Sequence, residues 1–208
     1  MSDGPYNPLE KRNLAESIQR RILQTSPLPL GDRSARLGTN GAGVYAIYYV
    51  GPFGLYSEIS DQNVDARWEA PIYVGKAIPE GQRVGSGIDS ALTATRALND
   101  RLLRHANSII QVENLDIGDF YFRYLVVDDV FITLGEAILI ETFQPLWNVL
   151  LSGFGNNPTG GPRSEQATSL WDTLHPGRKG AGRSAKSIIM EVEELVRNYL
   201  SENPPMRR

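Results

Sequence analysis

The order of three β-rich runs and two helical segments constrains the fold of this chain more than any other feature. Two β-rich runs bounded by glycine, Val44–Val50 and Pro71–Gly75, are followed by a helical pattern from Asp89, a suitable N-cap, to Ser108. A third β-rich run, Asp119–Val127, precedes a strongly apolar helical segment, Phe131–Phe143. The order strand, strand, helix, strand, helix predicts an α+β domain in which the first two strands are neighbours.

Long connections and two terminal helices surround this series. Asn7–Leu23 carries apolar residues three and four positions apart, which predicts an N-terminal helix, and Leu30–Asn40 indicates a loop. Gly51–Glu69 is a long insertion between the first two strands, and Asn148–Gly182 has little periodicity. Ser184–Ser201 has the pattern of an amphipathic helix. Loops this long inside a compact domain are usually functional.

The composition excludes several classes of site and protein. A chain of 208 residues, 41% of them hydrophobic, is expected to form one domain with its own core. Because it has no cysteine, disulfides and thiolate metal sites are excluded, and with only His105 and His175 a zinc site built on histidines is not expected. Any metal is expected to be bound by oxygen atoms. No signal peptide or apolar run of transmembrane length is present, so we expect a soluble bacterial cytoplasmic protein with no membrane partner.

The net charge does not favour a nucleic-acid partner, although the distribution of charge is uneven. The formal net charge is −3, whereas proteins that contact phosphates usually present a basic surface. Between Gly153 and Lys186, five basic residues stand against two acidic ones, a local excess of +3. Both this cluster and a second one near the N-terminus could also be ordinary solvated surface. The basic residues are Arg163, Arg178, Lys179, Arg183 and Lys186, and Lys11, Arg12, Arg20 and Arg21.

Two glycine-rich stretches match nucleotide-binding patterns only loosely. Gly41–Ala46 fits the dinucleotide-binding spacing, but it precedes a strand instead of following one. Gly81–Gly87 lacks the terminal lysine and hydroxyl of a phosphate-binding loop. The chain also contains no Gly-x-Ser-x-Gly elbow and no His-Glu-x-x-His pair, which argues against an α/β-hydrolase and a zinc protease.

Several polar residues stand among the apolar segments, and each has a structural alternative. Tyr45 and Tyr73 could be ordinary strand tyrosines. Arg101 and His105, four residues apart on one helix face, could form a solvent-facing pair. Glu136 lies inside an apolar helix, where a buried carboxylate is costly unless it is paired or metal-bound, although an outward-facing Glu136 would escape this argument.

Taken together, these residues resemble the GIY-YIG nuclease superfamily over Gly43–Asn148, about half of the chain. Asn148, which alone could be a helix-end cap, follows Glu136 by twelve positions, as in the repair-nuclease members. The matching motifs are Gly43-Val44-Tyr45, Tyr73-Val74-Gly75, Arg101 four residues before His105, and Pro145-Leu146-Trp147-Asn148.

The chain departs from the superfamily pattern in two ways. Valine replaces isoleucine in both tyrosine motifs, and Tyr45 and Tyr73 are 28 positions apart, a much longer separation than in compact members. This insertion argues against a minimal repair or homing nuclease. Gly153–Asn156 and Trp171–Arg178 resemble the type II restriction enzymes of the superfamily, especially those that cut CCGCGG.

The resemblance implies an α+β fold with a small three-stranded antiparallel sheet flanked by helices. It places a core at 43–148, an insertion at 51–69, an N-terminal helical arm at 1–30 and a C-terminal loop and helix at 149–208. All belong to one nuclease domain spanning the whole chain. The insertion, the arm and the C-terminal segment are expected to be decorations that bind DNA.

The resemblance also implies Mg²⁺-dependent hydrolysis of double-stranded DNA, with 5′-phosphate and 3′-hydroxyl products. Tyr45 would be the general base, helped by cations because a free tyrosine has a pKa near ~10, although the sequence leaves open which tyrosine acts. Glu136 would be the sole protein ligand of one Mg²⁺ per active site, for which Mn²⁺ could substitute. Around them, Tyr73 would bind water or phosphate, Lys76 would assist the tyrosine, Arg101 would clamp phosphate oxygens, His105 would orient the phosphate or the tyrosine, and Asn148 would brace the site.

Recognition of a particular site must come from the decorations, because phosphate contacts are the same for every DNA sequence. A palindromic site favours a two-fold homodimer, with the N-terminal helix as the candidate arm between protomers. The enzyme class implies a cognate DNA methyltransferase in the same cell. The candidates for base contacts are Gln62, Asn63, Arg67, Arg163, Gln166, Arg178 and Lys179.

Two other functions are compatible with the same residues. A structure-specific GIY-YIG endonuclease of repair or recombination would cut flaps or junctions without needing a palindrome. A non-catalytic DNA-binding protein on the same scaffold would need a degraded site, but all the polar positions are filled here.

Overall fold

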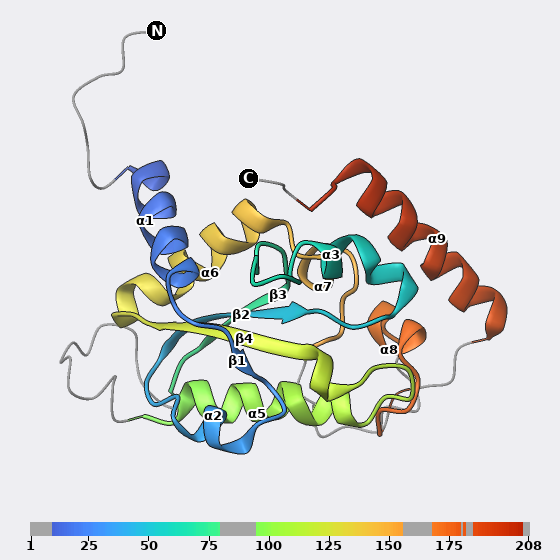
Figure 1. Cartoon of the computed structure of the whole chain (residues 1–208), viewed down its shortest axis with the longest axis horizontal. Coiled ribbons are helices and arrows are strands. Elements are labelled where there is room, and N and C mark those ends of the chain that lie inside the picture. Colours follow the sequence, from blue (N-terminus) through green and yellow to red (C-terminus); the bar gives the residue numbers. More distant parts are fainter. Residues whose placement is uncertain (1–9, 80–94, 156–167, 180, 182–184, 206–208) are drawn as a thin grey trace, which may run out of the picture.

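The computed structural model describes residues 10–79, 95–155, 168–179, 181 and 185–205, without the side chains of residues 11 and 12. An antiparallel sheet of four strands in the order β1-β4-β2-β3 forms its centre (Figure 1). The three predicted strands are β2 (Gly43–Tyr49), β3 (Pro71–Ala77) and β4 (Phe120–Val126). The α+β fold class is confirmed.

One strand is not among those predicted. β1 (Leu28–Pro29) pairs with Phe122 and Tyr121 of β4 at the outer edge of the sheet. The predicted N-terminal arm, 1–30, includes both residues, and Pro29 cannot donate a ladder hydrogen bond. An edge strand tolerates this loss on its unpaired side. The prediction of three strands is therefore short by one edge strand.

The two faces of the sheet carry different layers, and β2 contributes to both because successive side chains point in opposite directions. Helices α1 (Lys11–Leu23) and α6 (Asp129–Phe143) cover one face, and α5 (Ala97–Ile110) covers the other (Figure 1). On the α1/α6 face, Val44, Ala46 and Tyr48 of β2 pack with Ile22, Ile132 and Leu139. On the α5 face, Tyr45, Ile47 and Tyr49 pack with Leu98, Leu102 and Ile109.

The helices agree with the predicted segments except at their ends. α1 begins at Lys11, α6 at Asp129, and the C-terminal helix is α9 (Lys186–Glu202). α5 begins at Ala97 rather than at Asp89, which lies outside the described residues. Thr95 and Arg96 are not helical, because the Thr95 carbonyl accepts a hydrogen bond from the Gly41 amide before β2.

Short helices occupy segments that the sequence indicated as loops. α2 (Arg33–Leu37) lies within the predicted loop 30–40, and its cap is Asp32, which accepts a hydrogen bond from the Ser34 amide. The insertion contains a 3₁₀ turn, η1 (Gly54–Tyr56), and α3 (Ser57–Asp61). The remaining short elements are η2 (Ile117–Asp119), α7 (Leu146–Val149) and α8 (Leu170–Leu174).

Asn63 holds the two ends of the insertion together. Its side-chain nitrogen donates to the carbonyl oxygens of Tyr49, at the end of β2, and Ala70, just before β3. Its side-chain oxygen accepts from the Ala70 amide. The long insertion can therefore leave β2 and β3 paired as neighbours, with Tyr45 opposite Gly75 and Ile47 opposite Tyr73.

None of the helices in the described part of the chain is both long and apolar enough to cross a membrane.

Candidate active site

A buried cluster of Tyr45, Tyr73 and His105 lies on the α5 face of the sheet. The Tyr45 hydroxyl and His105 Nε2 are 2.6 Å apart and hydrogen-bonded. The ring centroids of Tyr45 and His105 are 5.4 Å apart, and those of Tyr73 and His105 are 5.1 Å apart. β2 and β3 each supply one tyrosine, and α5 supplies the histidine. The predicted residues of the two tyrosine motifs and of the helix thus converge.

Gly75 is required by the cross-strand geometry of this cluster. It pairs with Tyr45 in the sheet, and a Cβ atom at position 75 would collide with the Tyr45 hydroxyl. Gly43 has a similar constraint, because a Cβ atom there would collide with the Leu125 carbonyl of β4. Gly75 therefore leaves room for the Tyr45 side chain, and Gly43 leaves room for the backbone of β4; neither has a positive φ.

Burial sets the protonation of the cluster. Burial raises the pKa of Tyr45 well above its usual value, and Tyr73 raises it further, while Arg101 opposes the rise. The pKa of Tyr73 is also raised by burial and opposed by Arg101. Burial lowers the pKa of His105 well below its usual value, and Arg101 and Arg104 lower it further. Both tyrosines and His105 are therefore neutral near pH 7.

Arg101 connects this cluster to an open cavity. Burial lowers its pKa, but the tyrosine hydroxyls of Tyr45 and Tyr73 more than offset this, so the guanidinium remains charged. Its Nε is buried and has no hydrogen-bond partner within the described structure. Arg101 also lines a cavity of about 500 Å³. A planar guanidinium that lines a cavity suits an oxyanion such as phosphate, because it can donate several N–H groups in a fixed geometry.

The same cavity brings Lys76 and Glu136 together. Lys76 Nζ and Glu136 Oε2 are 2.7 Å apart, and the side chains are 34% and 22% exposed. Lys76 lies on β3 with its side chain on the α6 face, whereas Tyr73 and Gly75 face α5. Because β3 is the edge strand, groups from both faces meet around its open side. The cavity is lined by Lys76, Ala77, Ile78, Pro79, Thr95, Ala97, Asp100, Arg101, Arg104 and Glu136.

Asn148 braces the same strand. Its side-chain oxygen accepts from the Val74 amide at 2.7 Å, and its side-chain nitrogen donates to the Val74 carbonyl at 2.8 Å. A single side chain thus satisfies both backbone groups of Val74 on the outer edge of β3. Val74 lies between Tyr73 and Gly75, so Asn148 positions the tyrosine motif without lining the cavity.

The donor set fits a hard divalent cation with few protein ligands. Across the residues that the structure describes, no three carboxylate, histidine or cysteine side chains cluster in a way that could enclose a metal ion. Glu136 offers one accessible carboxylate in a cavity wide enough for water and a phosphate. Mg²⁺ is commonly bound by one or two carboxylates, several waters and substrate phosphates. GIY-YIG nucleases generally use divalent metal ions.

Three predicted base-contacting residues do not fit that role. Asn63 is fully buried and its amide is used within the insertion, and Gln62 beside it is only 7% exposed. The Arg178 side chain is 8% exposed and donates to both carboxylate oxygens of Asp172, at 2.7 and 2.6 Å, and to the Gly153 carbonyl. In this arrangement the Asn63 amide and the Arg178 guanidinium are engaged within the decorations and Gln62 is buried, so none of the three presents a free side chain to DNA.

The other base-contacting candidates differ in how well the structure places them. Arg67 and Lys179 are exposed, in the insertion and after α8 respectively. Arg163 and Gln166 lie outside the described residues.

Three residues near the site had no role in the sequence analysis. Phe154 stacks on His105 with ring centroids 4.6 Å apart, and a Cβ atom at Gly155, whose φ is +80°, would press on Tyr73 and His105. Their signal was the Gly153–Asn156 motif, noted only as a resemblance. Arg104 lines the cavity one helical turn from Arg101, and that spacing could have indicated it.

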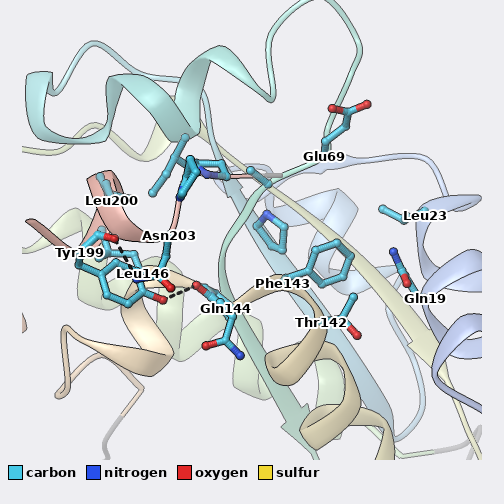
Figure 2. A pocket seen from close by; sticks show the side chains of 16 residues that line it. Gln19, Leu23, Glu69, Thr142, Phe143, Gln144, Leu146, Tyr199, Leu200 and Asn203 are labelled. Atoms are coloured by element: carbon cyan, nitrogen blue, oxygen red, sulfur yellow. Dashed lines mark hydrogen bonds between the residues drawn. The ribbon is translucent and has the colours of Figure 1, made fainter. Parts of the chain in front are cut away.

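A second cavity lies away from these groups. Its volume is about 290 Å³, and it is bordered by Gln19 of α1, Phe143 and Gln144 at the end of α6, and Tyr199 of α9 (Figure 2). The Tyr199 hydroxyl donates to the Gln144 carbonyl. None of the seven predicted catalytic residues belongs to the described lining of this cavity.

The fold and the site together define the class. An antiparallel sheet with a tyrosine on each of two paired strands, an arginine and histidine on α5 and a carboxylate on α6 is the arrangement of a GIY-YIG nuclease domain. The family model described as the Eco29kI GIY-YIG domain matches residues 38–200, well over half of the chain. The chain therefore belongs to this restriction endonuclease family, whose members are nucleases acting on DNA. No curated protein matches the chain.

Proposed function

We propose that the protein is a Mg²⁺-dependent type II restriction endonuclease that hydrolyses double-stranded DNA at a palindromic site, with CCGCGG as the first candidate. The observation that carries the proposal is the meeting of Lys76, Arg101 and Glu136 in one open cavity beside the hydrogen-bonded pair of Tyr45 and His105. Phosphodiester hydrolysis requires cations that bind the phosphate, a carboxylate that binds the metal and a group that transfers a proton, here a hydroxyl.

Tyr45 is the better placed of the two tyrosines to act as base. Its hydroxyl is 2.6 Å from Nε2 of a neutral histidine, which can accept a proton. The attacking water would give its proton to the Tyr45 oxygen while the Tyr45 proton moves to His105. The oxygen–phosphorus bond to water forms, the bond to the 3′ oxygen breaks, and that oxygen takes a proton from solvent.

Arg101 is proposed to control access to this pair. Neither Tyr45 nor Tyr73 is part of the described cavity lining, whereas Arg101 interacts with both hydroxyls and lines the cavity. A scissile phosphate would draw the guanidinium towards the cavity, and its negative charge would offset the repulsion between Arg101 and a protonated His105. A divalent ion held by Glu136 would supply Lewis-acid stabilisation of the phosphate and the leaving oxygen.

Specificity and assembly complete the proposal. Lys179 and Arg67 are the described candidates for contacts with guanine, and Arg163 and Gln166, which lie outside the described residues, are further candidates for base contacts. A homodimer would match a palindrome. α1 packs on α6 and β4 of its own chain and buries Ile22, so only its outer face is available to a second protomer. A cognate methyltransferase would protect the host DNA.

The test is digestion of two sequenced plasmids, one with and one without CCGCGG, in Mg²⁺ or in EDTA. The wild type is compared with Glu136→Ala and with Glu141→Ala, which changes an exposed carboxylate on the same helix. We expect discrete Mg²⁺-dependent fragments from the wild type and Glu141→Ala, and none from Glu136→Ala. Cleavage of flaps or junctions with intact plasmids would indicate a structure-specific nuclease instead, and DNA binding without any cleavage would indicate a non-catalytic role.

A further inference from the structure

We propose that Lys76 is an internal counter-ion that competes with the divalent metal for Glu136, so that the DNA-free enzyme binds metal weakly. DNA phosphate would then release Glu136 by pairing with Lys76. This inference rests on the proposed function, because it takes Glu136 as the metal ligand.

The ion pair is well formed without any substrate. Nζ of Lys76 and Oε2 of Glu136 are 2.7 Å apart, which is the length of a charge-assisted hydrogen bond. Both side chains are partly exposed to the cavity, at 34% and 22%. The ammonium therefore lies where a cation bound to this carboxylate would lie. A metal ion must either displace Lys76 or share the carboxylate with a like charge next to it.

The surroundings make this competition matter. The described lining contributes one more acidic residue, Asp100, and two more cations, Arg101 and Arg104. With Glu136 neutralised by Lys76, the cavity offers little attraction to a divalent ion, and no three-residue ligand cluster exists in the described structure to compensate. Glu136 is thus both the proposed metal ligand and the partner of a competing ammonium.

A phosphate changes the balance in two ways. It gives Lys76 and the arginines a new anion to bind, and it adds oxygen ligands for the metal. DNA and metal should therefore strengthen each other's binding, and this coupling must be reciprocal. Metal would be loaded where a phosphate is in place, rather than in the free enzyme.

The competition and the catalytic role of Lys76 predict opposite effects for the same substitution. Loss of Lys76 should reduce cleavage, because the scissile phosphate loses one of the cations that line the cavity. The same loss should increase the metal affinity of the DNA-free protein, because Glu136 becomes available. A lysine that merely stabilises the fold or holds Glu136 in place would not raise metal affinity when removed.

The experiment measures Mn²⁺ binding by electron paramagnetic resonance on the full chain without DNA. The variants are the wild type, Lys76→Met, Lys76→Gln, Glu136→Gln and the double variant Lys76→Met/Glu136→Gln. Lys186→Met, an exposed lysine at the start of α9, is the control for loss of one positive charge. Thermal melting of each variant checks folding.

We expect both Lys76 variants to bind Mn²⁺ about tenfold more tightly than the wild type, equivalent to about 1.4 kcal/mol. The gain should disappear in the double variant and be absent in Lys186→Met. Equal or weaker binding in the Lys76 variants, with binding still dependent on Glu136, would overturn the competition while leaving the metal ligand intact. Binding that ignores Glu136 in every variant would instead overturn the metal assignment on which the inference rests.

A second measurement tests the role of DNA. In a Tyr45→Phe background, which the proposed mechanism makes inactive, Mn²⁺ affinity is measured with and without a duplex carrying the mapped site. The duplex should tighten Mn²⁺ binding more in the Tyr45→Phe variant, which retains Lys76, than in the double variant Tyr45→Phe/Lys76→Met. An equal gain in both would overturn the proposal that phosphate releases Glu136 from Lys76.

Discussion

Replacement of Arg178 by leucine distinguishes a framework residue from a base-reading one. The Arg178 and Asp172 side chains are each 8% exposed, and the arginine donates at 2.7 and 2.6 Å to the two carboxylate oxygens. It also donates to the Gly153 carbonyl and lies over the Trp171 ring, with its guanidinium carbon 5.0 Å from the ring centroid. This pair joins α8 to the Gly153 turn, which precedes the Phe154 that stacks on His105.

The expected cost follows from leaving Asp172 buried without its partner. Ser169 still donates one hydrogen bond to this carboxylate, at 2.7 Å, but the opposite charge and two hydrogen bonds are lost. Removing one partner of a buried ion pair typically costs about 3–5 kcal/mol. For a chain of this size, the melting temperature should fall by roughly 6–20 °C. The double variant Arg178→Leu/Asp172→Leu should recover part of this loss, because no isolated charge remains.

The assay is urea unfolding of the wild type, Arg178→Leu, the double variant and Lys179→Met. Lys179 is the exposed neighbour, so Lys179→Met should change stability by less than about 0.5 kcal/mol. It should instead weaken DNA binding and lower its salt dependence. If the free energy of unfolding of Arg178→Leu lies within about 1 kcal/mol of the wild-type value but the variant loses site recognition, the framework interpretation is refuted and Arg178 reads DNA.

Two further outcomes follow from the site. Gly75→Ala should displace the Tyr45 hydroxyl from His105 and slow cleavage at least about 100-fold, with little change in DNA affinity. The control Gly54→Ala should cleave at the normal rate, because a Cβ atom at this position meets nothing within 4 Å. Single-turnover rates and filter binding measure both, and a normal rate for Gly75→Ala would contradict the proposed base. Burial lowers the pKa of His175 to about 3, so the unfolded chain binds more protons below about pH 6.5 and stability must fall as pH drops from there towards 3. Between pH 7 and pH 5, the free energy of unfolding measured in urea should fall by about 2 kcal/mol less for His175→Gln than for the wild type. Equal falls would show that His175 is not held neutral.

The predicted base-contacting set shows why loop residues are difficult to assign from sequence. Asn63 and Arg178 have the chemistry of base readers and lie in segments with little periodicity, so nothing local separates them from Lys179. Burial separates them, and burial depends on contacts that no local pattern indicates: Asn63 bonds to Tyr49 and Ala70, and Arg178 bonds to Asp172 and to Gly153. β1 depends on contacts of much longer range, because its pairing partners on β4 lie more than 90 positions away.

Local spacing alone determined the order of the main strands and helices, because alternation and helical periodicity are properties of neighbouring residues. The joint spacing of Tyr45, Tyr73, Arg101, Glu136 and Asn148 also determined the family, which the match over residues 38–200 supports. Only the tertiary structure decided which of these groups touch. β3 lies at the sheet edge, so Lys76 from one face and Arg101 beside the other meet in one cavity, and Lys76 pairs with Glu136 there. Contacts of this kind join residues far apart in the chain, and their distances are set by packing and not by any local pattern.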